Sequence, residues 1–434
     1  MEREATKVDV LLGLQWGDEG KGKAVDALAP RYQAVARFQG GPNAGHSLEF
    51  DNKKFVLRSV PSGIFREGVY SLIGNGVVLD PVLFCQEVEE LRAAGADVEH
   101  RLRISRKAHL ILPTHRYLDA ALERMRSDGK IGSTGKGIGP AYTSKAAREG
   151  VRIGDSEFPV LFKQRYGEAK EYHMRLLHDL DADLHGLDEA ERAFLAAVEK
   201  LRTFQLVNSE YEVNRLLREG KRVLAEGAQG TQLDVDFGTY PFVTSSSTVC
   251  GGACIGLGVA PQRIGEVYGI VKAYCTRVGA GPFFTELHDE VGRMMQERGH
   301  EKGAVTGRPR RCGWLDMVAL KYAVMVNGVT RLILTKADVL SGFEEVKVGV
   351  GYVDASGRRY DHVPYDTVDG LKPEYRAFPG WSEDITGVRR YEELPATLRS
   401  YVEYIEQETG VPVAIVSVGP DREQTIVREE LMRG

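Results

Sequence analysis

The glycine-rich segment at residues 17–23, GDEGKGK, has the spacing G-x-x-x-x-G-K that binds nucleotide phosphates. It directly follows an apolar run at residues 8–14, so its backbone and the helix expected after it can face phosphate oxygens. A P-loop continues with Ser or Thr, whose hydroxyl binds Mg²⁺, but this chain has Ala24. Asp18 is the obvious replacement ligand, because Mg²⁺ prefers carboxylate, carbonyl and phosphate oxygens. The alternative is a glycine-rich turn with solvated charges.

A second glycine-rich segment, QGGPNAGHS at residues 39–47, has a histidine near its end. Its glycines let the backbone approach a phosphate closely. There His46 can donate a proton or a hydrogen bond to a phosphoryl oxygen as negative charge develops. A lone histidine is usually structural, and the loop that carries this one is what favours a chemical role.

Residues 335–338 read TKAD, the T-K-x-D form of the guanine-specificity motif. The carboxylate of Asp338 can accept hydrogen bonds from guanine N1–H and N2–H₂, and the stem of Lys336 can lie along the base. Four residues are a weak pattern, more often an ordinary strand exit, but these follow a predicted buried strand, where the ligand loops of parallel sheets gather. Ser417 and Gly419, after the last predicted strand, are a plausible lid over the same base.

Apolar runs that end in small or polar residues recur along the chain and begin at Val8, Val69, Arg222, Glu266, Arg331 and Val413. Helical periodicity is clear at residues 84–95, 117–127 and 316–326. This alternation predicts an α/β fold, with a mostly parallel central sheet, flanking helices and a P-loop-like turn after the first strand. We expect a helix-rich insertion at about residues 100–220 and a polar excursion at about 351–395. Without a linker or internal repeat, residues 1–434 are predicted to form a single domain.

The composition excludes several classes of protein. A net charge of −5 and a pI near 6.1 leave no basic excess for a nucleic-acid polymer. The five cysteines are odd in number and form no C-x-x-C pair, which fits a reducing compartment. We see neither a signal peptide nor the ~18 consecutive apolar residues of a membrane span. The expected location is the cytoplasm, with no membrane partner.

Several long motifs together resemble the adenylosuccinate synthetase family. They are WGDEGKGK, QGGPNAGH, IGSTGKGIGPAY, EGAQGTQLDVDFGTYPFVTSSS, VTGRPRRCGWLD, TKAD and SVGPDR, in the family's order from Trp16 to Arg422. The resemblance implies a ligase: GTP phosphorylates the 6-oxygen of IMP, and L-aspartate then displaces that phosphate to give adenylosuccinate, the first committed step from IMP to AMP. It also implies one Mg²⁺ per subunit.

The resemblance assigns the site residues by motif. Asp18 resembles the general base at purine N1 and, with the carbonyl of Gly45, a metal ligand; His46 resembles the general acid that helps GDP to leave. The GTP site would comprise Gly17, Glu19, Gly20, Lys21, Gly22, Lys23, Gly45, Ser47, Arg310, Lys336, Asp338, Ser417 and Gly419. The IMP site would comprise Asp18, Lys21, Asn43, His46, Thr134, Arg148, Gln229, Thr244 and Arg308. The aspartate site would comprise Val305, Thr306, Arg308 and Arg310.

In this family the arginine that matches Arg148 reaches the nucleotide of the partner subunit, so the resemblance implies a homodimer. From its own context, the solvated run SKAARE, Arg148 would be an ordinary surface residue. Val305 stands where other members have Thr, which leaves the detailed aspartate contacts open. Lys136 and Ser133 replace the more common Arg and Thr with the same chemical type.

Two other functions fit parts of the sequence. The glycine-rich residues 135–139 suggest a nicotinamide dehydrogenase, but they lack the fingerprint spacing and a preceding strand. A GTP-dependent switch or GTPase module would use residues 17–23 and 335–338, but it gives no task to His46, Gln229 or the arginine-rich loop at residues 304–311, AVTGRPRR.

Overall fold

The computed structural model describes residues 6–126, 132–303, 307–363, 365 and 370–432. A large sheet runs through its middle. From edge to edge its strands are β19 (Thr425–Val427), β18 (Val413–Ser417), β14 (Arg331–Thr335), β11 (Ile264–Lys272), β1 (Val8–Gly13), β10 (Val223–Glu226), β2 (Ala34–Arg37), β5 (Tyr70–Ile73), β7 (Leu102–Ser105) and β9 (Gln205–Val207). Neighbours from β18 to β9 are parallel, and β19 is antiparallel to β18. The predicted mostly parallel sheet is therefore confirmed.

Strand β1 is central in the sheet, and this explains why its sequence, VDVLLG, is apolar except for Asp9. It pairs with β10 on one side and β11 on the other, and all its residues are buried. Val8, Val10 and Leu12 pack into one hydrophobic cluster, while Leu11 packs into another on the opposite face. Each such Val or Leu contributes about 1.5–3 kcal/mol on burial. The strand thereby fixes the start of the phosphate turn.

Helices connect the strands and cover the sheet. Their bounds are α1 (Lys21–Leu28), α2 (Pro81–Ala93), α3 (Val98–Arg101), α4 (Pro113–Met125), α5 (Ile138–Ala147), α6 (Pro159–Asp179), α7 (Leu187–Leu201), α8 (Ser209–Arg218), α9 (Cys250–Leu257), α10 (Glu290–Arg298), α11 (Met317–Asn327) and α12 (Ala396–Thr409). The three helices expected from periodicity correspond to α2, α4 and α11. Helix α11 begins where the Asp316 carboxylate accepts from the backbone N–H of Ala319, and it ends at Gly328 in the left-handed conformation.

A second sheet lies beside the first and holds part of the polar region at residues 351–395. Its strands are β12 (Tyr274–Arg277), β13 (Arg311–Asp316), β15 (Glu345–Val353), β16 (Arg359–Tyr360) and β17 (Lys372–Pro379). Strand β17 runs antiparallel to β15. The region expected as an excursion thus contains strands of its own. Similarly, the helix-rich region includes β9, which returns the chain to the main sheet beside β7.

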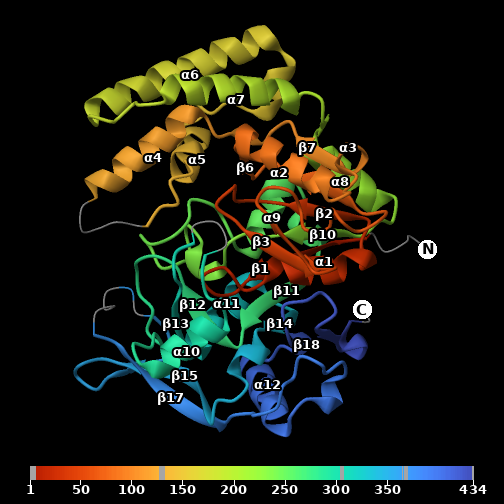
Figure 1. The fold of residues 1–434 in the computed structure, drawn as a ribbon, viewed down its shortest axis with the longest axis vertical. Helices are drawn as coiled ribbons and strands as arrows, with labels where there is room; N and C mark the ends of the chain where they lie inside the picture. The colour runs from red at the N-terminus through yellow and green to blue at the C-terminus, as the bar shows by residue number, and fades with distance from the viewer. Residues whose placement is uncertain (1–5, 127–131, 304–306, 364, 366–369, 433–434) are drawn as a thin grey trace.

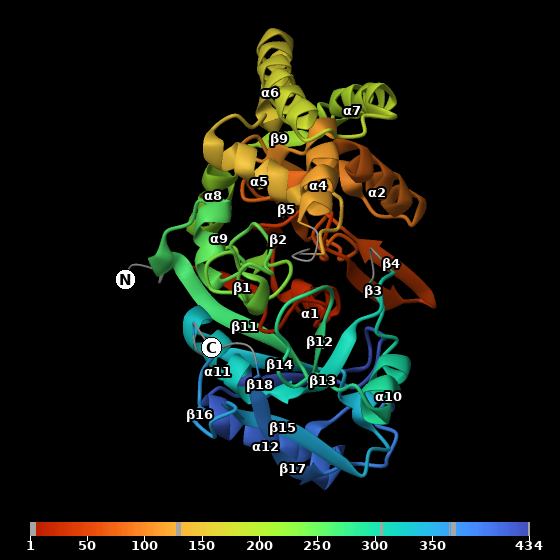
Figure 2. The same ribbon diagram turned by 90° about the vertical axis from the view of Figure 1, so that its left-hand side faces the viewer.

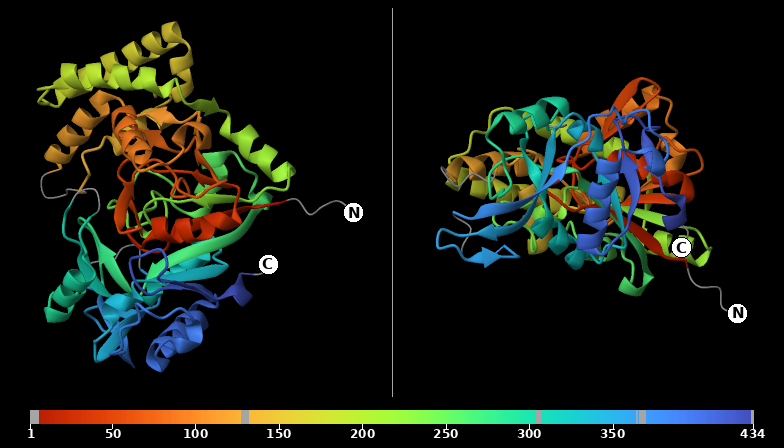
Figure 3. Two further views of the ribbon diagram at one scale, coloured as in Figure 1. Left: turned by 45° about the vertical axis from the view of Figure 1, so that its right-hand side comes forward. Right: turned by 90° about the horizontal axis from the view of Figure 1, so that it is seen from below.

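The figures show how these parts are arranged. The α6–α7 hairpin forms one end of the molecule, and β15, β17 and α12 form the opposite end, with the main sheet between them (Figures 1 and 2). A hairpin of β3 (His46–Phe50) and β4 (Lys53–Leu57) follows the second glycine-rich loop, and the short strands β6 (Val78–Leu79) and β8 (His109–Leu110) pair nearby. The two chain ends lie on the same side of the molecule (Figure 3). Among the described residues, every helix is too short or too polar to cross a membrane.

Candidate active site

The turn after β1 has the unusual backbone that a phosphate loop needs. Gly17, Asp18 and Gly20 have φ values of 85°, 59° and 92°. Glycine adopts this left-handed region at no steric cost, whereas Asp18 does so as a non-glycine residue, which is common at functional sites. The carboxylate of Glu19 accepts from the backbone N–H groups of Gln15 at 3.1 Å and Gly17 at 3.0 Å and pairs with Lys21. Glu19 therefore shapes the turn from inside.

Lys23, the lysine of the G-x-x-x-x-G-K pattern, makes hydrogen bonds to a distant part of the chain. Its Nζ donates to Ser417 Oγ at 2.7 Å, to Gly419 O at 2.6 Å and to Gln424 O at 2.9 Å. Burial lowers the pKa of Lys23 to about 8. Lys23 thus joins the first turn of α1 to the loop after β18, which was predicted as the guanine lid.

The second glycine-rich loop packs directly on α1. A Cβ on Gly22 would lie 2.8 Å from His46 Cβ and 3.1 Å from Ser47 O, so only glycine fits this position. The loop at Gln229 approaches from the other side, because a Cβ on Gly17 would lie 3.5 Å from Gln229 Cα and a Cβ on Gly40 would lie 3.2 Å from Gln229 Oε1. Three segments distant in sequence therefore meet at the phosphate turn.

His46 is buried and held by a carboxylate that the sequence did not single out. Its Nδ1 lies 2.5 Å from Oε1 of Glu226, at the end of β10. Glu226 also accepts from the Ser62 hydroxyl at 2.6 Å and from the Ser62 backbone N–H at 2.8 Å. Nε2 of His46 is buried and makes no hydrogen bond within the described residues. Burial, aided by nearby Arg37, lowers the pKa of His46 to about 4, so the ring is neutral in the free protein.

Asp18 faces the arginine-rich loop. Arg310 donates from Nε to Oδ2 of Asp18 at 2.8 Å, and its Nη1 pairs with the buried Glu301. Lys272, at the end of β11, also contacts Glu301, with Nζ 3.0 Å from Oε1. Arg308 donates to Gly132 O at 2.9 Å, which links this loop to residues 132–137. The predicted aspartate-site residues Val305 and Thr306 lie outside the described residues.

The TKAD segment follows β14, next to β18 in the sheet. The Thr335 hydroxyl donates to the backbone carbonyl of Glu19 at 2.7 Å, which ties this segment to the phosphate turn. Lys336 has φ 62° and donates to Gly299 O at 2.9 Å. Burial raises the pKa of Asp338, a partly buried carboxylate. The segment and the lid loop with Ser417 and Gly419 thus lie on either side of Lys23.

The remaining residues predicted to bind IMP lie in loops. Asn43 Oδ1 and Gln229 Oε1 are buried and have no hydrogen-bond partner within the described part of the chain. Thr244 is half-buried, and its backbone N–H donates to Leu233 O at 2.8 Å. Thr134 is half-buried beside Ser133, whose hydroxyl donates to Asp119 on α4 at 2.6 Å. Gly45 and Ser47, also half-buried, flank His46.

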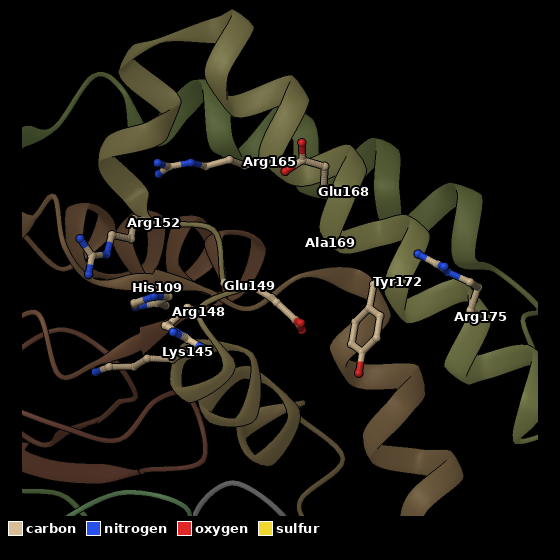
Figure 4. A pocket seen from close by; sticks show the side chains of 11 residues that line it. His109, Lys145, Arg148, Glu149, Arg152, Arg165, Glu168, Ala169, Tyr172 and Arg175 are labelled. Carbon is tan, nitrogen blue, oxygen red and sulfur yellow. The ribbon is translucent and has the colours of Figure 1, made fainter.

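Arg148 lies apart from this group. It is exposed, in the left-handed conformation at the C-terminal end of α5, with φ 68°. It lines a cavity of about 550 Å³ that no residue of the phosphate turn lines. Figure 4 shows Arg148 and Lys145 on one side of this cavity and Tyr172 and Arg175 of α6 on the other.

The residues that sequence reasoning missed are charged groups at the ends of apolar strands. Glu226 ends the run VLAE, and Lys272 ends IGEVYGIVK. A buried charge must be paired, so a charged residue inside an apolar run is a signal for a polar site. Glu301 has no such local signal.

A phosphate turn at the carboxyl edge of a parallel sheet, a guanine motif after a strand two places away in that sheet and a histidine–carboxylate pair define a nucleotide-dependent α/β enzyme. The family model for adenylosuccinate synthetase matches residues 10–426. The chain belongs to the adenylosuccinate synthetase family. This confirms the predicted family and the predicted enzyme class, a ligase that joins IMP and aspartate with GTP.

Individual relatives agree over nearly the whole chain. An adenylosuccinate synthetase of Phocaeicola vulgatus is 59% identical over 422 residues, which cover 97% of this chain and 99% of the relative. One of Porphyromonas gingivalis is 56% identical over 423 residues, covering 98% and 99%. A solved structure of fully ligated adenylosuccinate synthetase from Plasmodium falciparum superposes with a TM-score of 0.91 at 38% identity, covering 97% of this chain and all of the other.

Proposed function

We propose that the ligation of IMP and L-aspartate takes place at the phosphate turn, with Asp18 as general base, His46 as general acid and Arg310 as a substrate-binding residue. The observation that carries this proposal is the packing of the His46 loop against Gly22 in the first turn of α1. This packing supports the proposal that a triphosphate binds on the turn and a purine monophosphate binds beside it.

In the first step, Asp18 takes the proton from N1 of IMP, and the electrons released make O6 a nucleophile. O6 attacks the γ-phosphorus of GTP, the bond to the bridging oxygen breaks, and GDP leaves. In the second step, the amino group of aspartate attacks C6 and expels the phosphate. Arg308 and Arg310 suit the two carboxylates of aspartate, because a guanidinium binds a carboxylate through two parallel N–H groups.

The Glu226 pair prepares His46 for its part. A neutral imidazole whose Nδ1–H donates to Glu226 presents a bare Nε2 toward the phosphates. An approaching phosphate raises the affinity of that nitrogen for a proton. The imidazolium then neutralises charge that develops on the leaving diphosphate.

The residues around the turn also fit a magnesium ion. Mg²⁺ usually keeps several waters and takes one or two protein oxygens plus substrate phosphates. The Asp18 carboxylate and the Gly45 carbonyl would provide the protein oxygens. When bound, the ion supplies charge neutralisation for the phosphoryl group.

We further propose that the active form is a cytoplasmic homodimer in which each chain, a single domain over residues 1–434, lends Arg148 to the other site. Arg148 is exposed and lies at the C-terminal end of α5, which supports a contact between its side chain and a second chain.

A coupled assay tests the function. Adenylosuccinate formation is followed by its absorbance with GTP, IMP, aspartate or Mg²⁺ left out in turn, and we expect product only with all four. GDP release from GTP alone, at the rate of the complete mixture, would instead support the GTPase alternative.

A further inference from the structure

A buried cluster of charges lies behind the phosphate turn, and Glu301 is at its centre. The side chains of Glu301 and Lys272 are both 0% exposed. Lys272 Nζ lies 3.0 Å and 3.1 Å from the two carboxylate oxygens of Glu301, and the Tyr274 hydroxyl donates to Oε1 at 2.5 Å. The Oε2 atom also pairs with Nη1 of Arg310. Four groups thus converge in a cluster whose centre, Glu301, is fully buried.

Arg310 bridges two carboxylates that differ in their access to solvent. Its Nη1 contacts Glu301, which is sealed inside, and its Nε contacts Asp18, whose side chain is 27% exposed on the phosphate turn. Because Glu301 is buried, a ligand on the phosphate turn does not compete for its contact with Arg310. Any ligand that binds Asp18 competes with Arg310 for the same carboxylate.

Glu301 also anchors the loop that carries Arg310. The backbone N–H of Arg310 donates to the carbonyl of Glu301 at 2.9 Å, and Lys302 bridges to Pro309 in antiparallel fashion. Gly303 and Arg308 are joined in the same way, by a backbone bond of 2.8 Å. The two ends of the arginine loop are therefore fastened to each other at residue 301.

The charge of Glu301 is permanent in the neutral range. Burial alone would favour the neutral acid, but Lys272 and Arg310 outweigh it and lower the pKa of Glu301 to about 2. Lys272 alone can balance this charge, so the guanidinium keeps its own positive charge available for a second anion. Asp18 is that anion in the free protein.

We propose that Glu301 is a positioning residue: it holds the guanidinium of Arg310 beside the phosphate turn, so that Arg310 exchanges Asp18 for the anionic substrates while it keeps its contact with Glu301. The inference rests on the proposed function, in which Asp18 takes the N1 proton and Arg310 faces GTP and aspartate. A carboxylate that orients a substrate-binding group through a fixed hydrogen bond contributes about 10–100-fold.

The test compares Glu301→Gln, Arg310→Gln and the double variant in steady-state kinetics. Glu301→Gln keeps the size of the side chain and removes its charge. We expect kcat/KM for aspartate to fall by about 10–100-fold, while KM for IMP changes by less than about twofold. If Glu301 acts through Arg310, the double variant loses no more than Arg310→Gln alone, because effects that share one route are not additive.

Glu191→Gln is the matched control. Glu191 also receives a lysine and a tyrosine, Lys170 at 2.6 Å and Tyr166 at 2.7 Å, but in the α6–α7 hairpin. We expect unchanged kcat/KM for aspartate in this variant. If Glu301→Gln does not fold, as judged by thermal unfolding, Glu301→Asp carries the test, since its shorter carboxylate keeps the charge and draws back from Arg310.

Three results would overturn the inference. They are additive losses in the double variant, equal losses for IMP and aspartate, or a folded Glu301→Asp with the kinetics of the wild type. A wild-type chain that makes no adenylosuccinate would defeat the proposed function as well. An active wild type with additive losses would defeat the role of Glu301 alone.

Discussion

Nδ1 of His46 and Oε1 of Glu226 lie 2.5 Å apart and join the start of β3 to the end of β10. The two residues are 180 positions apart in the chain. Their contact fixes which ring nitrogen carries the proton, and Nε2 has no hydrogen-bond partner among the described residues.

We expect Glu226→Gln to lower kcat by about 100-fold, because an amide can orient the ring but cannot stabilise the imidazolium. Steady-state kinetics at saturating GTP, IMP and aspartate provide the measurement. Asp9→Asn is the control, since Asp9 is also a buried carboxylate, bonded to Tyr32 at 2.7 Å, but at the opposite end of the strands. Normal turnover in Glu226→Gln would remove Glu226 from the mechanism.

Asp18→Asn should bind nucleotides but lose turnover by about 10²–10⁴-fold, because the amide cannot accept the N1 proton. Calorimetric titration with IMP and with GTP separates binding from chemistry. A variant with nearly normal kcat would show that another group takes the proton.

Asp338→Asn should relax the preference for guanine. The carboxylate accepts two hydrogen bonds from guanine, and inosine lacks the 2-amino donor, so the ratio of kcat/KM for GTP to that for ITP should fall by about 10-fold or more. Asp421→Asn removes a neighbouring charge that acts on Lys23 and is expected to leave the ratio unchanged. An unaltered ratio in Asp338→Asn would mean that the base is recognised elsewhere.

Mixing two inactive variants tests the transfer of Arg148 between subunits. Arg148→Ala and Asp18→Asn should each be inactive alone. After subunit exchange, about half of the dimers are mixed and each has one complete site, so about a quarter of the wild-type activity should return. Exchange is verified with chains that carry different tags. If exchange is proven and no activity returns, Arg148 either acts in the site of its own subunit or takes no part in the reaction.

The stability that Glu301 contributes should depend on pH. Its pKa is lowered from 4.5 to about 2, so the folded state binds the proton less tightly than the unfolded state. The contribution is complete above about pH 4.5, is lost as the pH falls toward 2, and amounts to about 3 kcal/mol. Urea unfolding of wild type and Glu301→Gln from pH 7 down to pH 3 should show the difference in unfolding free energy shrinking only in the acidic part. A difference that is constant with pH would contradict this assignment.

Local sequence patterns were enough to predict the elements whose hydrophobic residues recur with a regular period. The run at residues 8–14 became β1, and the residues from 331 and 413 became β14 and β18. The three residues of β9 are too few to show a period, and β17, with mostly exposed residues, lacks the apolar alternation of a half-buried strand. Such edge strands are set by pairing with distant partners.

The phosphate turn and the guanine motif could be found because each is contiguous in sequence. The charge at the end of an apolar run marks Glu226 as a candidate for a polar site, but its partner His46 is 180 positions away, and Glu301 has no local signal at all. Arg310 and Asp18, for instance, are 292 positions apart. No sequence motif spans such a separation. These groups come together only because of the order of the strands in the sheet.

The three bonds from Lys23 to the loop after β18 have a consequence for how the enzyme is made. They fasten α1 to residues that lie 394 to 401 positions further along the chain. Because a chain is synthesised from its N-terminus, the phosphate turn is made long before the residues that hold Lys23. Lys23 therefore gains these three contacts only after β18 and the loop that follows it have been added.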